Sequence, residues 1–564
     1  MRNSDTRGVF IAAVAVLAIL APFLNKAFHI DDPLFLWMAQ RISHHPGDPY
    51  GFAANWYISA QPMFSIMQNP PASSYYMALV ANFLGWSEPA MHGAFLVPAI
   101  AAVAGTFFLA RRLSGSPLLA ALLLLFTPVF LVSATGLMCD VWLLAFWVWS
   151  IECWKRALER NSAWFLFLAS VLVAAAALTK YFGAALVPLL AVYTLARERR
   201  VTHRILYLLI PMLVIASYEA ITKAKYGQGL FSSAMLVSWN ENAKPDQHFV
   251  HRLLIGLSFT GGCLLNLLFY APLLKLSSRE PESLTAESGW KPSFRILIVG
   301  FALLVIFVPL FHFGADLPLS STIEGALFVT IGIGILVLTL ADVLQYKTAD
   351  SLLLFLWVFG TFIFAAMMNW TISARTFLPM APAVIILLIR RLRVSALGAA
   401  AVTGPSFEKD STPKVFEVAS WWPLLPAALV SLLIAIGDYT LANTARTAAS
   451  RFQQRFRNES GTVWFEGHWG FQYYMQHWRA KPLDLEQHGL VPGDVLIVPV
   501  NNTNVSRQPA APTIASFEET IYAQFFAITM SREVGAGFYS SKWGPLPWKV
   551  AAVPPERYLT FRIK

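Results

Sequence analysis

Long apolar runs separated by short polar segments make up most of this chain. A helix that crosses a lipid bilayer needs about 20 predominantly apolar residues. Runs of this kind predict about thirteen membrane helices, at residues 9–28, 92–110, 117–136, 140–155, 163–179, 183–196, 204–222, 252–274, 295–312, 323–342, 352–369, 376–390 and 420–440. We therefore expect residues 1–440 to form an all-α polytopic membrane domain.

Two further stretches show helical apolar spacing without the length needed to cross a bilayer. They cover residues 32–44 and 72–86, inside a long segment, 29–91, that joins the first two predicted spans. Amphipathic helices of this length suit the interface between lipid and water. The pattern thus predicts interfacial helices in the first outer loop.

The pattern changes after residue 440. An amphipathic stretch from Thr444 to Arg457 comes first, and short apolar runs follow at Thr462–Phe465 and Val495–Val500. Turn-forming residues separate these runs, as in small mixed domains. Residues 441–564 are therefore predicted to form a small α/β domain.

Composition and charge agree with the membrane interpretation. Apolar residues make up 56% of the chain and charged residues 13%, whereas a soluble protein has about a quarter of its residues charged. The net charge of +10 does not indicate a nucleic-acid partner, because the basic residues form short clusters between apolar runs. If the N-terminus with Arg2 and Arg7 is cytoplasmic, alternation of the spans places almost every basic cluster on that side. This topology predicts a multi-pass protein of the inner (plasma) membrane with an extracytoplasmic C-terminal domain.

Two smaller observations refine this expectation. The run Val9–Phe28 lacks a small-residue cleavage site, so it is predicted to be a retained membrane helix rather than a signal peptide. The three cysteines show no metal-binding or disulfide spacing and are expected to be buried thiols.

Four polar features stand out at the predicted outer ends of the spans. The first is the acidic pair Asp31–Asp32, because ionised carboxylates are costly near hydrocarbon unless they are solvated, paired or functional. The others are Asp140, Lys180 and Arg375. Lys and Arg on this side could hold a phosphate group. Each feature also has a plain structural interpretation: a solvated loop carboxylate, a helix N-cap, a snorkelling lysine and an interfacial anchor, respectively.

Familiar nucleotide and hydrolase motifs are absent from the sequence. It contains no Gly-x-Gly-x-x-Gly or Walker A loop, no His-Glu-x-x-His and no Gly-x-Ser-x-Gly. An enzyme that works at the outer face has no cytosolic nucleotide sugar available, so this absence is compatible with an outer active site.

The order of several short motifs resembles the C-type membrane glycosyltransferases. The resemblance is to the bacterial branch that includes the aminoarabinose transferase of lipid A, the protein O-mannosyltransferases and the rhizobial lipopolysaccharide glycosyltransferases. It rests on His29-Ile30-Asp31-Asp32-Pro33, Asn69-Pro70-Pro71 to Tyr76, Leu84-Gly85-Trp86-Ser87-Glu88, Ala110-Arg111-Arg112-Leu113-Ser114-Gly115, Asp140, Leu178-Thr179-Lys180-Tyr181 and Arg375 to Pro382. Relatives often carry His or a Glu-Lys pair before the Pro-Pro, where this chain has Gln68-Asn69.

The resemblance implies a sugar donor linked to polyprenyl phosphate, used at the outer membrane face. It implies that Asp31 is the base for an acceptor hydroxyl, supported by Asp32 and Asp140. We expect Lys180, Arg375, Asn69 and Tyr181 among the substrate contacts. The acceptor, which is a lipid, a glycan or a protein, and any need for a divalent metal stay open.

The hypothesis from the sequence is therefore an inverting glycosyltransferase with membrane lipids as neighbours and no nucleic-acid partner. The alternative is a transporter or lipid flippase without chemistry. Transporters tend to show inverted repeats and polar groups near the midplane. This chain shows no such repeat, and its polar outliers gather at the predicted outer boundary.

Overall fold

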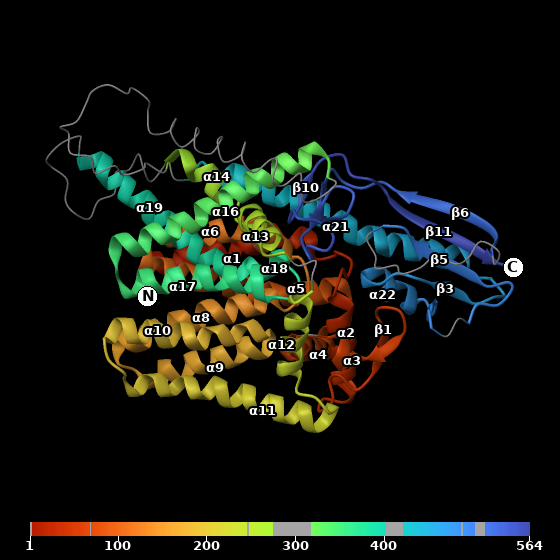
Figure 1. The fold of residues 1–564 in the computed structure, drawn as a ribbon, viewed down its shortest axis with the longest axis horizontal. Helices are drawn as coiled ribbons and strands as arrows, with labels where there is room; N and C mark the ends of the chain where they lie inside the picture. Colours follow the sequence, from red (N-terminus) through yellow and green to blue (C-terminus); the bar gives the residue numbers. More distant parts are fainter. Residues whose placement is uncertain are drawn as a thin grey trace.

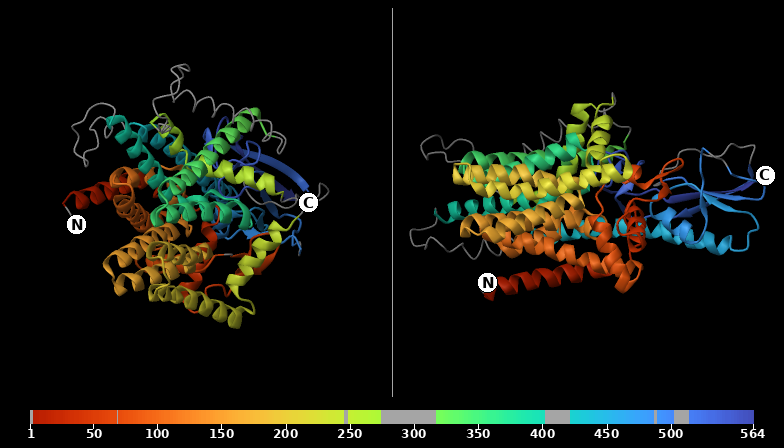
Figure 2. Two further views of the ribbon diagram at one scale, coloured as in Figure 1. Left: turned by 60° about the vertical axis from the view of Figure 1, so that its left-hand side comes forward. Right: turned by 90° about the horizontal axis from the view of Figure 1, so that it is seen from below.

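The structure is a computed structural model, and it describes residues 3–67, 69–244, 248–273, 317–401, 421–486, 489–501 and 514–564. Long helices lie side by side along the longest axis of the molecule, and a sheet stands at one end of this bundle (Figure 1). The N-terminus and the C-terminal strands lie toward opposite ends of that axis (Figure 2).

The bundle reproduces the apolar runs of the sequence. Its helices are α1 (Asn3–Leu20), α5 (Glu88–Leu113), α6 (Pro117–Leu125), α7 (Pro128–Ala134), α8 (Asp140–Arg160), α9 (Ala163–Thr179), α10 (Leu186–Glu198), α11 (Leu209–Tyr226), α13 (Phe249–Cys263), α14 (Asn266–Tyr270), α16 (Leu319–Tyr346), α17 (Ala349–Ile363), α18 (Ala374–Phe377), α19 (Ala381–Ala401) and α21 (Leu424–Arg455). Short 3-10 segments at Ala21–Phe23, Tyr181–Ala185, His203–Leu208, Ala271–Leu273 and Leu378–Met380, and a π-helical turn at Phe364–Met368, adjoin them.

A helix, or a pair of adjoining helices, covers most of every predicted span except 295–312, which lies outside the described residues. Six described helices are long and apolar enough to cross a bilayer, or seven if α6 and α7 count as one span bent by 64°. The chain therefore has several candidate spans, and the number of about thirteen stays a prediction.

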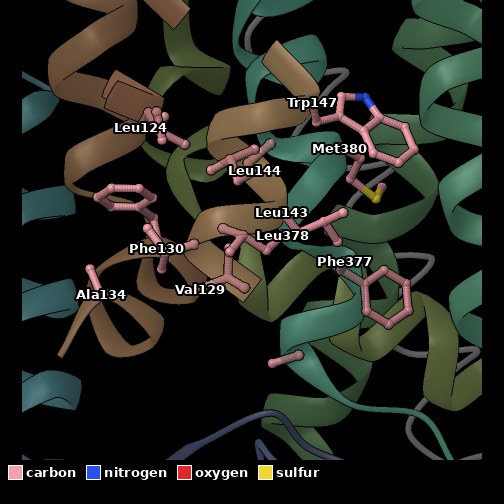
Figure 3. Packing of buried hydrophobic residues seen from close by; sticks show 14 of the residues in the cluster. Leu124, Val129, Phe130, Ala134, Leu143, Leu144, Trp147, Phe377, Leu378 and Met380 are labelled. Atoms are coloured by element: carbon pink, nitrogen blue, oxygen red, sulfur yellow. The ribbon is translucent and has the colours of Figure 1, made fainter. Parts of the chain in front are cut away.

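The bend between α6 and α7 has a simple cause. Pro128 begins α7 directly after Thr127, and a proline cannot donate the backbone hydrogen bond that would continue the preceding helix. The short helix α7 packs into an apolar core with α8, α18 and the Leu378–Met380 turn (Figure 3). The side chains that meet there include Val129, Phe130, Leu143, Leu144, Trp147, Phe377, Leu378 and Met380 (Figure 3).

Short elements gather where the bundle meets the sheet (Figure 1). They are α2 (Asp32–His44), α3 (Met63–Ile66), α4 (Ala72–Leu84), α12 (Leu230–Asn242) and an antiparallel hairpin of β1 (Ala53–Asn55) and β2 (Ala60–Pro62). The predicted helices at residues 32–44 and 72–86 are confirmed as helices. Their place at a lipid interface stays a prediction.

The C-terminal part contains a five-stranded sheet in the order β4-β3-β5-β11-β6. The strands are β3 (Val463–Phe465), β4 (Lys481–Pro482), β5 (Val495–Pro499), β6 (Ile514–Tyr522) and β11 (Glu556–Ile563), and the helix α22 (Trp469–His477) accompanies them. β3 pairs in parallel with β4 and β5, whereas β11 is antiparallel to β5 and β6. The predicted mixture of helix and strand is thus present.

The sheet is joined closely to the bundle. Helix α21 runs without a break through residues 440 and 441, so the domain boundary predicted there falls inside a helix and stays a prediction. Between β6 and β11 the chain returns toward the bundle with four two-residue strands, β7 (Ala527–Ile528), β8 (Met530–Ser531), β9 (Ala536–Gly537) and β10 (Lys549–Val550). The Trp548 indole donates a hydrogen bond of 2.9 Å to the Gly262 carbonyl in α13. We call residues 527–550 the return segment.

The cysteine prediction is confirmed. Cys139, Cys153 and Cys263 are free thiols, and all three are buried.

Candidate active site

The two carboxylates of the acidic pair have different surroundings. Asp32 is fully buried. One oxygen accepts the His29 backbone N–H at 2.9 Å, and the other accepts the Leu137 backbone N–H at 3.0 Å. Burial raises the pKa of Asp32 to about 6, although both backbone N–H groups act in the opposite direction. Asp32 therefore ties the turn before α2 to the turn after α7.

Asp31 has a third of its side chain exposed and belongs to a group of alternating charges. Its Oδ2 lies 3.1 Å from Arg375 Nη2, and Arg375 Nη1 lies 3.5 Å from Asp140 Oδ2. The Lys180 ammonium completes the series at 2.7 Å from Asp140 Oδ1. We call these four residues the charge cluster. Segments that are far apart in the sequence meet in this cluster. The sequence predicted that these residues lie at the outer ends of the spans, but it did not predict the contacts between them.

Local structure explains how each member reaches the cluster. Asp31 is the N-cap of α2, and Asp140 is the first residue of α8, where the positive end of the helix favours a carboxylate. Lys180 directly follows α9. Arg375 lies in the one-turn helix α18, whose Phe377 packs in the core shared with α7 and α8 (Figure 3). That apolar packing fixes the backbone on which the charges stand.

Two residues that the sequence suggested as substrate contacts lie in a different network. The Tyr181 hydroxyl is 3.2 Å from the Tyr218 hydroxyl, which is 3.2 Å from the Tyr50 hydroxyl. Tyr50 in turn donates to the Asn69 backbone carbonyl at 2.8 Å. Within the residues that the structure describes, no hydrogen bond or ion pair joins Asn69 or Tyr181 to the charge cluster. The hydroxyl groups of Tyr218 and Tyr50 thus connect Tyr181 with the Asn69 backbone, which gives both residues a structural role.

A buried ion pair lies behind the cluster and was missed in the sequence. Lys26 Nζ lies 2.5 Å from Asp438 Oδ2, both side chains are fully buried, and the ammonium also donates to Thr135 Oγ1 at 3.0 Å. The hydroxyls of Thr529 and Tyr539 donate to Asp438 at 2.5 Å and 2.9 Å. A signal for this pair existed, because Lys26 and Asp438 fall within predicted apolar spans, where ionisable residues are rare.

The site does not suit a metal ion. Among the described residues, no group of three or more His, Cys, Asp or Glu side chains is arranged to hold one. The carboxylates that could contribute, Asp31 and Asp140, already share the guanidinium of Arg375. A divalent cation would have to sit beside that fixed positive charge, which opposes its binding.

The turn between β3 and α22 connects the C-terminal part to the β1–β2 hairpin. His468 lies 3.0 Å from both Gln472 Oε1 and the Tyr57 carbonyl, so it joins α22 to the loop of the β1–β2 hairpin. Glu466 is buried, its Oε2 has no hydrogen-bond partner among the described residues, and burial raises its pKa to about 7.

Residues 68–219 match the sequence model of a family described as dolichyl-phosphate-mannose-protein mannosyltransferase. This stretch of the chain carries the mannosyltransferase family pattern. The resemblance to C-type membrane glycosyltransferases is thereby confirmed over this region. The mannosyltransferase-like region contains Asp140 and Lys180, whereas Asp31 and Arg375 lie outside it. The charge cluster thus joins two residues of this region with two from elsewhere.

Two solved structures show a partial likeness to this chain, each with a TM-score below 0.5. The Archaeoglobus fulgidus oligosaccharyltransferase, tethered with an acceptor peptide, is 12% identical with a TM-score of 0.48, and the match covers 86% of this chain and 64% of that chain. The ArnT protein from Cupriavidus metallidurans bound to undecaprenyl phosphate is 14% identical with a TM-score of 0.45, over 87% of this chain and 93% of that chain. This chain therefore spans less than two thirds of the archaeal enzyme. No curated protein sequence matches the chain.

Proposed function

We propose that this protein is a membrane glycosyltransferase that moves a sugar from a polyprenyl-phosphate donor to a hydroxyl acceptor at the outer membrane face. The observation that carries this proposal is the charge cluster, in which a partly exposed carboxylate stands beside fixed cations. The match of residues 68–219 to a family of sugar transferases supports it. On this proposal the outer side is the end of the bundle that carries α2 and the sheet.

On this proposal Asp31 is the base. Asp31 Oδ2 is engaged by Arg375, whereas no hydrogen bond to Oδ1 is found within the described part of the chain. That oxygen accepts the proton of an acceptor hydroxyl as the hydroxyl oxygen attacks the anomeric carbon. The bond from this carbon to the phosphate oxygen breaks, and the lipid phosphate leaves with the bonding electrons. Attack from the side opposite the phosphate inverts the anomeric configuration.

The cations stabilise the departing phosphate. Charge that develops on the leaving group is stabilised best by groups fixed before the reaction, in a site with little water. Arg375 is 13% exposed and Lys180 is 18% exposed, and Asp140 holds both by ion pairs. Asp140 therefore acts as an anchor for the cations, and Asp32 orients the turn that carries Asp31.

The test compares the same substitution at two aspartates, one inside the charge cluster and one outside it. Purified protein in proteoliposomes receives a polyprenyl-phosphate-linked sugar and an envelope extract of the producing cells as acceptor, and the release of polyprenyl phosphate is measured. Asp31→Asn removes the base and should lower the rate at least about 100-fold. Asp48→Asn is the matched control, because Asp48 also pairs with an arginine, Arg41 at 2.9 Å, outside the charge cluster.

The control variant should keep its rate within about threefold, because a partly exposed ion pair contributes little. If Asp31→Asn retains more than a tenth of the wild-type rate, Asp31 is not the base. If intact donor lipid crosses the bilayer and no polyprenyl phosphate appears, the protein is a flippase and the proposal is wrong.

A further inference from the structure

The return segment reaches the backbone that carries Arg375. The Ala374 N–H donates to the Phe538 carbonyl at 2.8 Å, and the Ser541 N–H donates to the Ile372 carbonyl at 2.7 Å. These two bonds pair the return segment with the chain immediately before the site arginine. The C-terminal part of the protein is therefore in direct contact with the backbone next to Arg375.

Tyr539 lies between those two bonds and connects two charged groups. Its ring centroid is 5.3 Å from Cζ of Arg375, within the range of a cation–π contact. Its hydroxyl donates to Asp438, with the two carboxylate oxygens at 2.9 Å and 3.1 Å. The side chain is 5% exposed.

The hydrogen bonds to Asp438 fix the position of the Tyr539 ring. Asp438, which holds the hydroxyl, is itself held by Lys26 and Thr529 at 2.5 Å each. Burial and the negative charge of Asp438 raise the pKa of Tyr539 well above its ordinary value, so the hydroxyl stays a donor. None of these partners belongs to the charge cluster, so the ring needs no substrate to hold its place.

Arg375 has one nitrogen that no described residue holds. Its two terminal nitrogens are directed to Asp31 and Asp140, whereas its buried Nε has no hydrogen-bond partner among the described residues. Nη1 also contacts Met138 Sδ, and the Tyr539 ring lies over the guanidinium carbon, with its centroid at 5.3 Å. Tyr539 therefore adds a contact to Arg375 that comes from outside the charge cluster.

We propose that Tyr539 is a positioning residue for Arg375, supplied to the active site by the return segment. This inference rests on the proposed function for its activity measurement. During transfer the proton reaches Asp31, and Arg375 loses the charge of one carboxylate partner. The ring then keeps the guanidinium in place while the phosphate gains charge, so Tyr539 acts on the chemical step more than on donor binding.

The experiment replaces Tyr539 in the full-length protein and measures kcat and KM for the lipid-linked donor in proteoliposomes. Tyr539→Phe keeps the ring and should keep kcat within about threefold. Tyr539→Leu removes the ring and should lower kcat about 3- to 30-fold with little change in KM, the range expected for one cation–π contact. Trp543→Leu is the matched control, because Trp543 stacks with Arg532 at 4.5 Å in the same segment, and it should leave kcat unchanged.

A graded series separates the electrostatic role of the ring from simple packing. Phenylalanines with one, two and three ring fluorines at position 539 keep nearly the same shape but weaken the attraction of the ring for a cation. The logarithm of kcat should fall steadily with the number of fluorines. A flat series, or Leu behaving like Phe, overturns the inference in a protein whose wild type is active.

A second measurement does not depend on activity. Tyr539→Leu and Arg375→Met are combined, and the loss of thermal stability of the double variant is compared with the sum for the single variants. The inference requires the double variant to lose less than that sum. Additive losses overturn the inference even if the wild type releases no polyprenyl phosphate, a result that by itself overturns only the proposed function.

Discussion

Replacing Lys26 tests how strongly the ion pair behind the site holds the protein together. Lys26→Met removes the ammonium but keeps a long apolar side chain, and it leaves the fully buried carboxylate of Asp438 without its cation. Breaking one partner of a buried pair costs more than removing both, because the remaining charge is uncompensated. The single substitution should therefore be strongly destabilising.

The contacts set the size of the effect. Lys26→Met loses the 2.5 Å bond to Asp438 and the 3.0 Å bond to Thr135. Asp438 keeps the hydroxyls of Thr529 and Tyr539, which offset part of the cost. A loss of about 3–5 kcal/mol is expected for such a pair. The double variant Lys26→Met/Asp438→Asn removes both charges and should recover about half of that loss.

The assay is thermal unfolding of the detergent-solubilised protein, with the two single variants and the double variant compared in a cycle. Lys225→Met is the control, since Lys225 pairs with Asp48 at 3.3 Å but is 37% exposed, and it should cost less than about 1 kcal/mol. A cost below about 1 kcal/mol for Lys26→Met, or a double variant less stable than both single variants, would refute this reasoning.

Two further predictions follow from contacts described above. Burial raises the pKa of Glu466 from 4.5 to about 7, so the folded protein retains a proton that the unfolded chain has released, and stability falls as pH rises through that window. Glu466→Gln should remove this slope and gain up to about 3 kcal/mol over the wild type near pH 8; parallel melting curves from pH 5 to 8 would contradict it. Tyr181→Phe loses only the 3.2 Å contact to Tyr218 and should change the transfer rate less than about threefold. Lys180 precedes Tyr181 in the sequence and belongs to the charge cluster, so Lys180→Met should lower the rate about 100-fold. Equal effects of the two substitutions would place Tyr181 at the substrate.

The apolar pattern was sufficient to predict most of the bundle. The spacing over residues 32–44 predicts a helix with the same bounds as α2. The run 117–136 was predicted as one span, and the break at Thr127–Pro128 divides it into two helices. Pro128 is visible in the sequence, but the direction of the bend depends on packing against α8 and α18, which a pattern of apolar residues does not specify.

The candidate site was predictable where neighbours in the sequence are also neighbours in space. Asp140 begins α8, and Lys180 follows α9, the next helix, so two consecutive antiparallel helices bring their ends together. The contacts of Arg375 required the full packing of α18. Nothing in the sequence distinguishes Tyr539 among 17 tyrosines, because its role comes from two partners, Arg375 and Asp438, that are distant along the chain.

On the proposed mechanism, the charges of the cluster explain why a base, Asp31, and a cation, Arg375, can form an ion pair without hindering each other. Asp31 and Asp140 carry two negative charges, and Arg375 and Lys180 carry two positive charges. A sugar linked to lipid phosphate brings about one negative charge, and the phosphate released carries up to about two. In the proposed transfer, the proton that Asp31 accepts removes one negative charge from the cluster as the phosphate gains one. The total charge of the site is therefore the same before and after transfer, and Arg375 exchanges one anionic partner for another without leaving the ring of Tyr539.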